Sequence, residues 1–436
     1  MKALIRAVFE ALVRLYYPVI ALDGRDRLPW SSPCLFVLNH PNGLLDPLVL
    51  RFGLDRPVRF LGKSTLFGNP FGRVTMEAFG GIPVFRPRDV GVGGGDSSRN
   101  EETFALCRAA LARGEWIALF PEGTSHSDPT MKPLKTGAAR IALSSVAAHA
   151  LDLQIVPVGL FYEQKATFRS RAALTVGAAI PVRAYMERYA ADERATVDAL
   201  TDDVRAGLDA VVLQADTREL LEGLARVAQW TVHPAARDDL AASRKRAGEL
   251  LVAWRGLRER NAARADALVD SGRAYLAAVG ALGVRDPWAL EVERVTAGSA
   301  LRAALRLTAL TPLAVVGLVL GWPMYRLAGR VAERVVARAE DVLGTVKMLA
   351  GMLLVPVGWV AAAAVLASRY GWHAAMAVAV LGPAGGYAAL RWEEHWGTAM
   401  EALRMARLRR ERATEVAALV ALRRALAEEI GAALGG

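Results

Sequence analysis

Between residues 30 and 182 the sequence alternates short apolar runs with helix-like segments, and this alternation constrains the fold more than any other feature. The runs typical of strands are 35–38, 58–61, 116–120, 155–162 and 173–176, and helical stretches such as 101–113 and 137–149 lie between them. Such alternation predicts an α/β domain with a largely parallel sheet. A ligand site is then expected beyond the carboxyl ends of the strands.

One stretch within this region, residues 34–50 (CLFVLNHPNGLLDPLVL), brings together two residues suited to chemistry. Its first apolar run ends at His40, a Pro-Asn-Gly segment breaks regular structure, and Asp46-Pro47 opens a second apolar run. We expect a buried strand, a tight turn, and a helix with Asp46 as its N-cap and Pro47 as its first residue. His40 and Asp46 then face one gap.

The chemistry open to this pair is general-base catalysis. A neutral imidazole near a hydroxyl group takes its proton as the oxygen attacks a carbonyl, which contributes about 10² to 10⁴ in rate. A carboxylate on the other ring nitrogen fixes the tautomer and stabilises the imidazolium. The alternative is structural, since a histidine at a strand end is often only hydrogen-bonded in place and Asp46 is explained as a helix cap.

Two further motifs are suited to a charged acceptor. Residues 80–86 (GGIPVFR) bring backbone close to a ligand and aim Arg86, whose planar guanidinium suits phosphate. Residues 120–125 (FPEGTS) follow a predicted strand, and Gly123 permits a sharp turn that presents Glu122 and backbone amides. The alternatives are an exposed arginine beside a turn and a plain strand-to-loop connection.

A fourth motif, residues 156–159 (VPVG), places Pro157 inside an apolar strand. Proline lacks the backbone N–H that a strand ladder needs, so this position predicts an edge strand or a bulge. Pro157 then lines an apolar acyl groove, or it is part of the core.

Composition narrows the class of partner. The 436-residue chain has a formal net charge of +10, which favours an anionic partner, and its apolar runs favour lipid over nucleic acid. Two cysteines, Cys34 and Cys107, provide neither a disulfide framework nor a metal spacing and indicate a reducing, cytosol-facing compartment.

The domain organisation follows from shifts in composition. Residues 1–20 predict an amphipathic N-terminal helix, not a signal peptide, whose apolar face lies on a membrane or on its own domain. The α/β domain occupies 21–185, and a helical region without a catalytic constellation covers 186–300. A membrane-associated region (301–392) and an amphipathic C-terminal helix (393–436) complete the chain.

Within the membrane-associated region, 349–367 and 374–390 are long enough to cross a bilayer core of about 30 Å as a hairpin near 349–390. The segment 307–324 contains two prolines and is followed by several arginines, which prefer the cytoplasmic side. We therefore expect it to dip into the membrane or lie at the interface. The alternative is a soluble bundle of three buried helices.

Taken in their order and spacing, the four motifs resemble the glycerolipid acyltransferase superfamily, whose members move a fatty acyl group from a thioester carrier to glycerol-3-phosphate or a lysophospholipid. The resemblance covers about residues 1–185. It implies that His40 is the general base, Asp46 its partner and Arg86 a phosphate contact. By the same resemblance Glu122 and Gly123 are part of the acceptor site. The resemblance does not assign the remaining candidates, which are Thr124, Lys63 and Lys135 as further substrate-binding residues and Pro157 in an acyl groove.

One departure from the family pattern is the spacing, because five residues instead of four separate His40 from Asp46. This segment is similar to the subgroup that includes fungal glycerol-3-phosphate/dihydroxyacetone-phosphate acyltransferases, which also carry hydrophobic segments after the catalytic domain. The similarity favours glycerol-3-phosphate as acceptor.

The expectation is therefore an α/β acyltransferase domain with a mostly parallel sheet, followed by an all-α region and C-terminal membrane helices. The catalytic domain lies on the cytoplasmic side, acyl-CoA or acyl carrier protein is the donor, and neither a metal nor a bound cofactor is implied. A lysophosphatidate or other lysophospholipid acyltransferase is the first alternative. A non-catalytic membrane scaffold and a thioesterase are the others.

Overall fold

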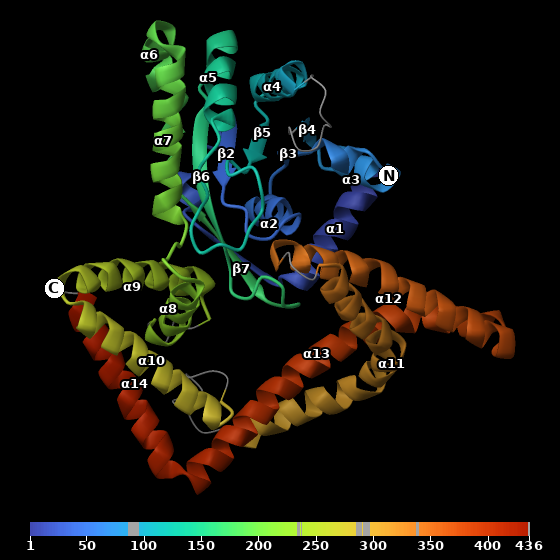
Figure 1. Cartoon of the computed structure of the whole chain (residues 1–436). Coiled ribbons are helices and arrows are strands. Elements are labelled where there is room, and N and C mark those ends of the chain that lie inside the picture. Colours follow the sequence, from blue (N-terminus) through green and yellow to red (C-terminus); the bar gives the residue numbers. More distant parts are fainter. Residues whose placement is uncertain are drawn as a thin grey trace. The chain divides into compact units, whose positions relative to one another are not determined.

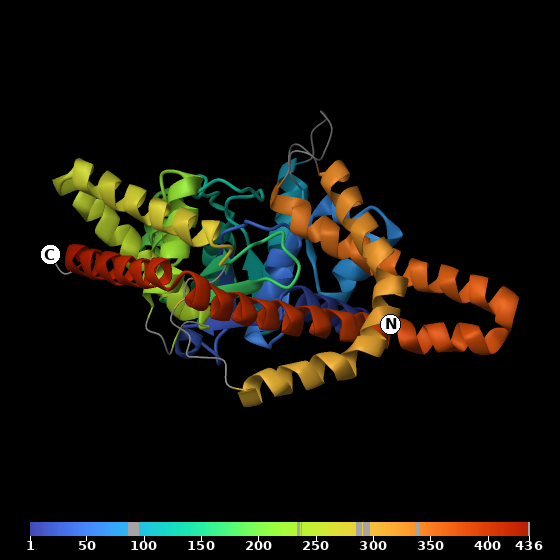
Figure 2. The same ribbon diagram turned by 90° about the horizontal axis from the view of Figure 1, so that it is seen from below.

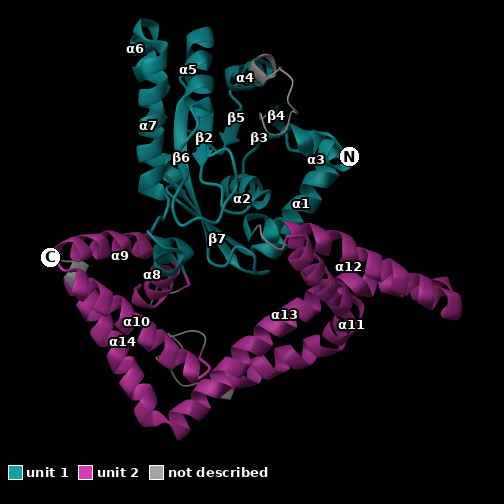
Figure 3. Cartoon of the chain, in the orientation of Figure 1, with its two compact units in different colours: residues 1–221, 239–244, 338–345 teal, residues 222–238, 245–337, 346–436 magenta. Residues whose placement is uncertain are grey.

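The computed structural model describes residues 1–85, 96–232, 236, 238–284, 290, 297–336 and 340–434. The chain divides into two compact units (Figure 3). Unit 1 comprises residues 1–221, 239–244 and 338–345, and unit 2 comprises residues 222–238, 245–337 and 346–436.

Unit 1 is built on a mixed, mostly parallel sheet (Figure 1). Its strands are β1 (Val19–Asp23), β2 (Cys34–Leu38), β3 (Val58–Lys63), β4 (Ile82–Val84), β5 (Trp116–Leu119), β6 (Gln154–Tyr162), β7 (Arg171–Val176) and β8 (Ile180–Pro181). They run in the order β1-β7-β6-β2-β5-β3-β4, and β8 also pairs with β6. The central run of β6, β2, β5, β3 and β4 is parallel, whereas β7 and β8 pair with β6 antiparallel. The predicted α/β architecture is confirmed.

The helices of unit 1 cover this sheet. They are α1 (Lys2–Tyr16), α2 (Leu45–Leu54), α3 (Pro70–Ala78), α4 (Asp96–Ala112), α5 (Gly137–His149), α6 (Met186–Ala191) and α7 (Glu193–Val211), with short 3-10 turns at Arg25–Arg27, Ser64–Phe67 and Val182–Tyr185. Every residue of β2 is fully buried, as expected for a central parallel strand.

Helix α7 extends the α/β unit beyond the predicted boundary at residue 185. Leu200, Val204 and Leu208 repeat every four residues along one face and are buried in the same apolar core as β2, β5 and α5. Because this face packs in the core of unit 1, the compact unit continues to residue 221.

Helix α1 packs on its own unit through Phe9, Val13 and Tyr16, which are all buried. Leu4 and Val8, part of the apolar face expected from the sequence, are exposed. Of the two placements expected for this helix, packing on its own domain is the one that the buried face supports, and the helix belongs to unit 1.

The expectation that Pro157 marks an edge or a bulge is wrong, because β6 lies between β2 and β7 inside the sheet. Pro157 is paired in register with Val37 of β2. On its other side β6 pairs with β8 up to Ile155 and with β7 from Val158. Proline is tolerated here because its missing N–H falls where the neighbouring strand changes.

Unit 2 is helical, as the composition predicted. It contains most of α8 (Arg218–Thr231), α9 (Leu240–Arg260), α10 (Ala262–Ala281), α11 (Ala297–Val335), α12 (Glu340–Tyr370) from residue 346, α13 (Trp372–Glu411) and α14 (Ala413–Leu434). A buried cluster including Trp230, Tyr275 and Met405 joins α8, α10 and α13. The C-terminal helix expected from residue 393 does not begin there, since α13 runs without interruption to Glu411.

Three apolar helices are candidate membrane spans among the described residues: α11, α12 and α13. Only 11%, 0% and 22% of their most apolar windows are buried, which contradicts the alternative of a soluble bundle. Gly371 separates α12 from α13, and the turn is visible between the orange and red helices of Figure 2. Pro312 and Pro323 do not interrupt α11, so by length and composition it is a candidate membrane span like α12 and α13. That it only dips into the membrane stays a prediction.

Close packing between α11 and α13 depends on glycine. A Cβ atom on Gly385 would lie 2.7 Å from the backbone nitrogen of Gly317, so the two backbones approach as only small residues allow. Small residues at such crossings are typical of helices that associate in a bilayer.

Candidate active site

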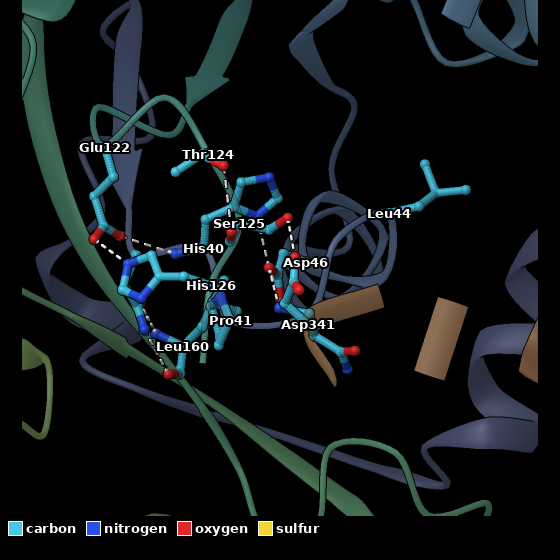
Figure 4. Close-up of polar contacts among 12 residues, drawn as sticks. His40, Pro41, Leu44, Asp46, Glu122, Thr124, Ser125, His126, Leu160 and Asp341 are labelled. Carbon is cyan, nitrogen blue, oxygen red and sulfur yellow. Dashed lines mark hydrogen bonds and ion pairs between the residues drawn. The ribbon is translucent and has the colours of Figure 1, made fainter. Parts of the chain in front are cut away.

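The site is assembled from loops that follow the carboxyl ends of central strands of the sheet (Figure 4). His40 follows β2 by two residues, the segment 120–125 follows β5 directly, and Tyr162 is the last residue of β6. Because β5, β2 and β6 are adjacent and parallel, their carboxyl ends lie side by side at the same end of the sheet.

The predicted pair forms as expected. His40 Nδ1 lies 2.8 Å from Asp46 Oδ2, and the Asp46 side chain is fully buried. The helix assignment was wrong in one respect: α2 begins at Leu45, so Asp46 lies in its first turn and does not cap it. Its carboxylate instead accepts hydrogen bonds from the Asn42 backbone N–H (2.7 Å) and the Tyr162 hydroxyl (2.6 Å).

These contacts determine the histidine tautomer. A carboxylate only accepts hydrogen bonds, so His40 Nδ1 carries the proton and Nε2 keeps its lone pair. Among the described residues Nε2 has no hydrogen-bond partner. The ring stacks on Phe120 with centroids 3.9 Å apart and planes at 12°, and the side chain is 15% exposed. The arrangement leaves one nitrogen ready to accept a proton.

Two buried tyrosines support the turn between His40 and Asp46. Burial and the Asp46 carboxylate raise the pKa of Tyr162, so this phenol remains a neutral donor to Asp46. Burial also raises the pKa of Tyr17, which donates to the Lys165 carbonyl. Tyr17 accepts a hydrogen bond from the Asn42 side chain at 2.7 Å. Neither tyrosine could be identified from local sequence pattern, because their contacts join residues far apart in the chain.

Gly43 accommodates the extra residue of the His–Asp spacing. Its φ of +54° lies in the left-handed region, where a residue with a side chain is strained. The backbone N–H of Asp46 bonds to the Gly43 carbonyl at 3.3 Å, which closes the turn into α2. The longer loop therefore still delivers Asp46 to His40.

Glu122 is 4% exposed and holds the loops after β2 and β5 together. Its carboxylate accepts the backbone N–H of His40 (3.2 Å) and of Lys132 (2.7 Å) and lies 2.5 Å from His126 Nε2. The His126 backbone N–H in turn donates to the His40 carbonyl at 3.1 Å. This geometry favours a role for Glu122 in shaping the turn over a role in contacting an acceptor. His126 was not singled out from the sequence, although it lies four residues after Glu122.

The remaining residues of the FPEGTS turn lie beside Glu122. Gly123 has φ +73°, and a Cβ there would be 2.6 Å from Lys135 Nζ, so the exposed Lys135 side chain folds over it. Thr124 donates to the Ser125 carbonyl at 3.3 Å. Lys135 is thus brought to the site edge.

Three predicted positions remain: Lys63, Arg86 and Pro157. Lys63 ends β3 and is exposed; β3 is two strands from β2, about 10 Å at the usual spacing. Arg86 lies outside the described residues, two positions after the end of β4. The Pro157 ring packs on α7, since a Cβ on Gly207 would lie 2.6 Å from its Cγ. The acyl-groove role of Pro157 stays a prediction.

Neither cysteine is suited to act as a nucleophile. Cys34 and Cys107 are fully buried, and burial raises the pKa of each thiol to about 12. Among the described residues no group of three or more His, Cys, Asp or Glu side chains is arranged to hold a metal ion.

Comparison with known proteins finds similarity to acyltransferases. Residues 19–160 match the family model described as Acyltransferase. An uncharacterized acyltransferase of Schizosaccharomyces pombe is 27% identical over 49% of this chain and 44% of its own length. Glycerol-3-phosphate O-acyltransferase 2 of Saccharomyces cerevisiae is 36% identical over 30% of this chain and 18% of its own. A chloroplastic 1-acyl-sn-glycerol-3-phosphate acyltransferase of Brassica napus is 29% identical over 33% and 38%.

The chain therefore spans less than half the length of each of these relatives. The crystal structure of the 1-acyl-sn-glycerophosphate acyltransferase from Thermotoga maritima matches with a TM-score of 0.34 and 17% identity, over 48% of this chain and 80% of that one.

Proposed function

We propose that the α/β domain of this chain belongs to the glycerolipid acyltransferase superfamily and that the protein is a membrane-bound O-acyltransferase, because residues 19–160 match the Acyltransferase family model and its relatives include glycerol-3-phosphate and 1-acyl-sn-glycerol-3-phosphate acyltransferases. It transfers a fatty acyl group from acyl-CoA or acyl carrier protein to glycerol-3-phosphate, a step of phospholipid synthesis. The apolar helices α11, α12 and α13 keep the enzyme at the membrane, where the lipid product is released.

One observation carries the proposal: the 2.8 Å contact between His40 Nδ1 and a fully buried Asp46 carboxylate, which leaves His40 Nε2 without a partner among the described residues. This is the arrangement that a general base requires, because one nitrogen is protonated and fixed while the other accepts a proton. Three donors on Asp46 hold the carboxylate in place.

The reaction follows from this geometry. His40 Nε2 takes the proton of an acceptor hydroxyl as its oxygen attacks the thioester carbonyl. The carbon–sulfur bond of the tetrahedral intermediate breaks, the thiolate leaves with the electron pair, and the imidazolium returns the proton to sulfur. Asp46 stabilises the imidazolium during the step. No acyl-enzyme, metal or bound cofactor takes part, so we expect transfer to be insensitive to a chelator.

The acceptor phosphate is held by cations at the edge of the sheet. Lys63 and Lys135 are exposed there, and we retain Arg86, which lies outside the described residues, as the principal phosphate contact because its planar guanidinium suits phosphate. Glu122 and Gly123 shape the turn beside the acceptor, and Thr124 lies within it.

Two features favour glycerol-3-phosphate as the acceptor: the five-residue spacing between His40 and Asp46, and similarity to the glycerol-3-phosphate O-acyltransferases of Saccharomyces cerevisiae. The second candidate acceptor is lysophosphatidate, because relatives from Brassica napus, Chlamydomonas reinhardtii and Arabidopsis thaliana are 1-acyl-sn-glycerol-3-phosphate acyltransferases. We further propose that the α/β unit faces the cytoplasm, where acyl thioesters are available.

The test is acyl transfer by the purified full chain in lipid nanodiscs. Labelled acyl-CoA and acyl carrier protein thioester are each offered with glycerol-3-phosphate or lysophosphatidate. We expect a lysophosphatidate product from glycerol-3-phosphate, lost in His40→Ala. A strong preference for lysophosphatidate would show that it, and not glycerol-3-phosphate, is the acceptor. Release of free fatty acid without any acceptor would identify a thioesterase. No transfer with any pair, or full cellular function of His40→Ala, points to the scaffold instead.

A further inference from the structure

The loop between His40 and Asp46 has a second support from a segment more than 300 positions along the chain. Residues 340–345, the first turns of α12, belong to unit 1. The Thr345 side chain lies against the loop and is 8% exposed. We call this segment, Glu340 to Thr345, the α12 brace.

The contact is specific to one hydroxyl group. Thr345 Oγ1 donates to the Asn42 carbonyl at 3.2 Å and accepts the Leu44 backbone N–H at 3.1 Å, so it spans the turn on both sides of Gly43. The same Asn42 residue donates its backbone N–H to Asp46 Oδ2 at 2.7 Å. A single side chain therefore holds the residue, Asn42, whose backbone N–H binds the carboxylate.

Packing around the hydroxyl leaves little room for the turn to move. A Cβ atom on Gly43 would lie 3.2 Å from Thr345 Oγ1 and 3.2 Å from Val342 Cγ1. A Cβ on Gly344 would lie 2.8 Å from Asn42 Oδ1. Each glycine backbone lies against side chains of the opposite segment, so a Cβ atom at either position would crowd the contact.

Two further contacts fix the brace in unit 1. Asp341 accepts a hydrogen bond from Ser125 Oγ at 2.5 Å, in the loop after β5. Glu340 pairs with Arg218 at 2.6 Å. The brace thus touches both loops that make the candidate site, and Figure 4 shows Asp341 beside Ser125.

From these contacts we infer that Thr345 is a positioning residue: it holds the 42–44 turn so that the Asn42 amide and Asp46 stay in register with His40. The role in the reaction rests on the proposed function; the hold on the turn does not. Thr345 has no contact with His40 and acts only through the turn. It also accounts for the longer His–Asp spacing, because the extra loop residue is supported from outside the loop.

The experiment compares Thr345→Val, which keeps the shape and removes the hydroxyl, with Thr345→Ser, which keeps the hydroxyl. In the full chain we expect kcat to fall about tenfold in the valine variant, with KM for both substrates within about twofold. Serine restores the rate. Thr201→Val is the matched control, because its hydroxyl bonds only to the Val197 carbonyl of its own helix, α7.

Hydrogen exchange supplies a readout that needs no activity. The peptide covering residues 40–46 exchanges its amides faster in Thr345→Val than in wild type, and Thr345→Ser matches wild type. Because the effect passes through Asp46, Thr345→Val costs much less rate in an Asp46→Asn background than in wild type.

Three outcomes overturn the inference: unchanged exchange in Thr345→Val, faster exchange with an unchanged kcat, or a loss of rate that adds fully to that of Asp46→Asn. If wild type transfers no acyl group, the proposed function fails, and the exchange comparison alone decides whether Thr345 holds the turn.

Discussion

The loop after β2 and the loop after β5 each set a histidine against a buried carboxylate. In the first, His40 Nδ1 lies 2.8 Å from Asp46; in the second, His126 Nε2 lies 2.5 Å from Glu122. The side chains are similarly enclosed, at 15% exposure for His40 and 11% for His126. Distance and burial alone do not separate the two pairs.

The second ring nitrogen separates them. His126 Nδ1 accepts the Asp128 backbone N–H at 3.2 Å and lies 3.5 Å from its carboxylate, so both nitrogens of His126 are engaged. His40 Nε2 has no partner within the described part of the chain. A histidine–carboxylate pair becomes a base only when the far nitrogen stays free, and otherwise it serves as a clamp.

The carboxylates differ in the same sense. Asp46 accepts two of its three hydrogen bonds from Asn42 and Tyr162, which orient its carboxylate toward the His40 imidazole. Glu122 binds the backbone amides of His40 and Lys132, which fixes the loops themselves. The His40–Asp46 pair is oriented with one ring nitrogen free, whereas the His126–Glu122 pair holds the two loops in place.

The largest expected effect is that of His40→Ala. Removing the base lowers kcat for acyl transfer by about 10² to 10⁴, with the unfolding temperature close to that of wild type. His149→Ala, an exposed histidine at the end of α5, is the control and keeps full activity. An active His40→Ala enzyme would remove the distinction between the two pairs.

Asp46→Asn comes next. An asparagine side chain has one oxygen. If its NH₂ group faces the two donors His40 and Asn42, the tautomer is lost; if it faces the Tyr162 hydroxyl, the tautomer is kept but the charge that stabilises the imidazolium is gone. We expect kcat to fall about 10²-fold. The control is Asp55→Asn at the other end of α2, where φ is +53° and asparagine is tolerated. Equal rates for the two variants would argue against a role for Asp46.

Tyr162→Phe removes one donor from the Asp46 carboxylate. A hydrogen bond to a charged group contributes about 1.5–3 kcal/mol, so we expect a loss of about tenfold or more in kcat. Tyr185→Phe is the control, because Tyr185 also donates to an aspartate (Asp203, 2.5 Å) but lies away from the site.

Tyr162 also predicts a pH dependence. Its pKa is raised in the folded protein, so the fold favours the neutral phenol. That stabilisation is complete below the unfolded pKa of about 10 and is lost as pH rises through the higher folded pKa. The unfolding temperature of wild type should therefore fall at alkaline pH more steeply than that of Tyr162→Phe.

The smallest expected effect is that of His126→Gln. The glutamine amide can still donate to Glu122, so the loop is kept and kcat changes by less than about threefold, with stability lowered by about 1 kcal/mol. Thermal unfolding and the acyl-transfer assay measure both quantities. A loss of rate as large as that of His40→Ala would show that the second pair takes part in the chemistry.

The sequence predicted what local pattern encodes. The apolar run before His40, the Pro-Asn-Gly break and the apolar run after Asp46 identified the strand, the turn and the pair, because each signal lies within a few residues. The N-cap assignment failed for a physical reason: an aspartate before proline is a good cap locally, but its oxygens are taken by two donors from the preceding loop and by the Tyr162 hydroxyl of β6.

The remaining features depend on distant parts of the chain. Tyr162 reaches Asp46 across 116 positions and Thr345 reaches Asn42 across 303, and no local pattern records either contact. Pro312 and Pro323 lie inside the continuous helix α11, as apolar helices tolerate proline. Pro157 is tolerated inside the sheet because its missing N–H falls where the neighbour of β6 changes from β8 to β7.

The measurement that tests the central claim most directly is histidine modification by diethyl pyrocarbonate, which acylates an unprotonated ring nitrogen that is free. The full chain is treated with and without substrates, peptides are mapped by mass spectrometry, and activity is followed in parallel. We expect His40 to react, activity to fall in proportion, and substrate to slow both, while His126 stays unmodified. Modification of His126 at the rate of His40, or loss of activity while His40 stays unmodified, would contradict the account.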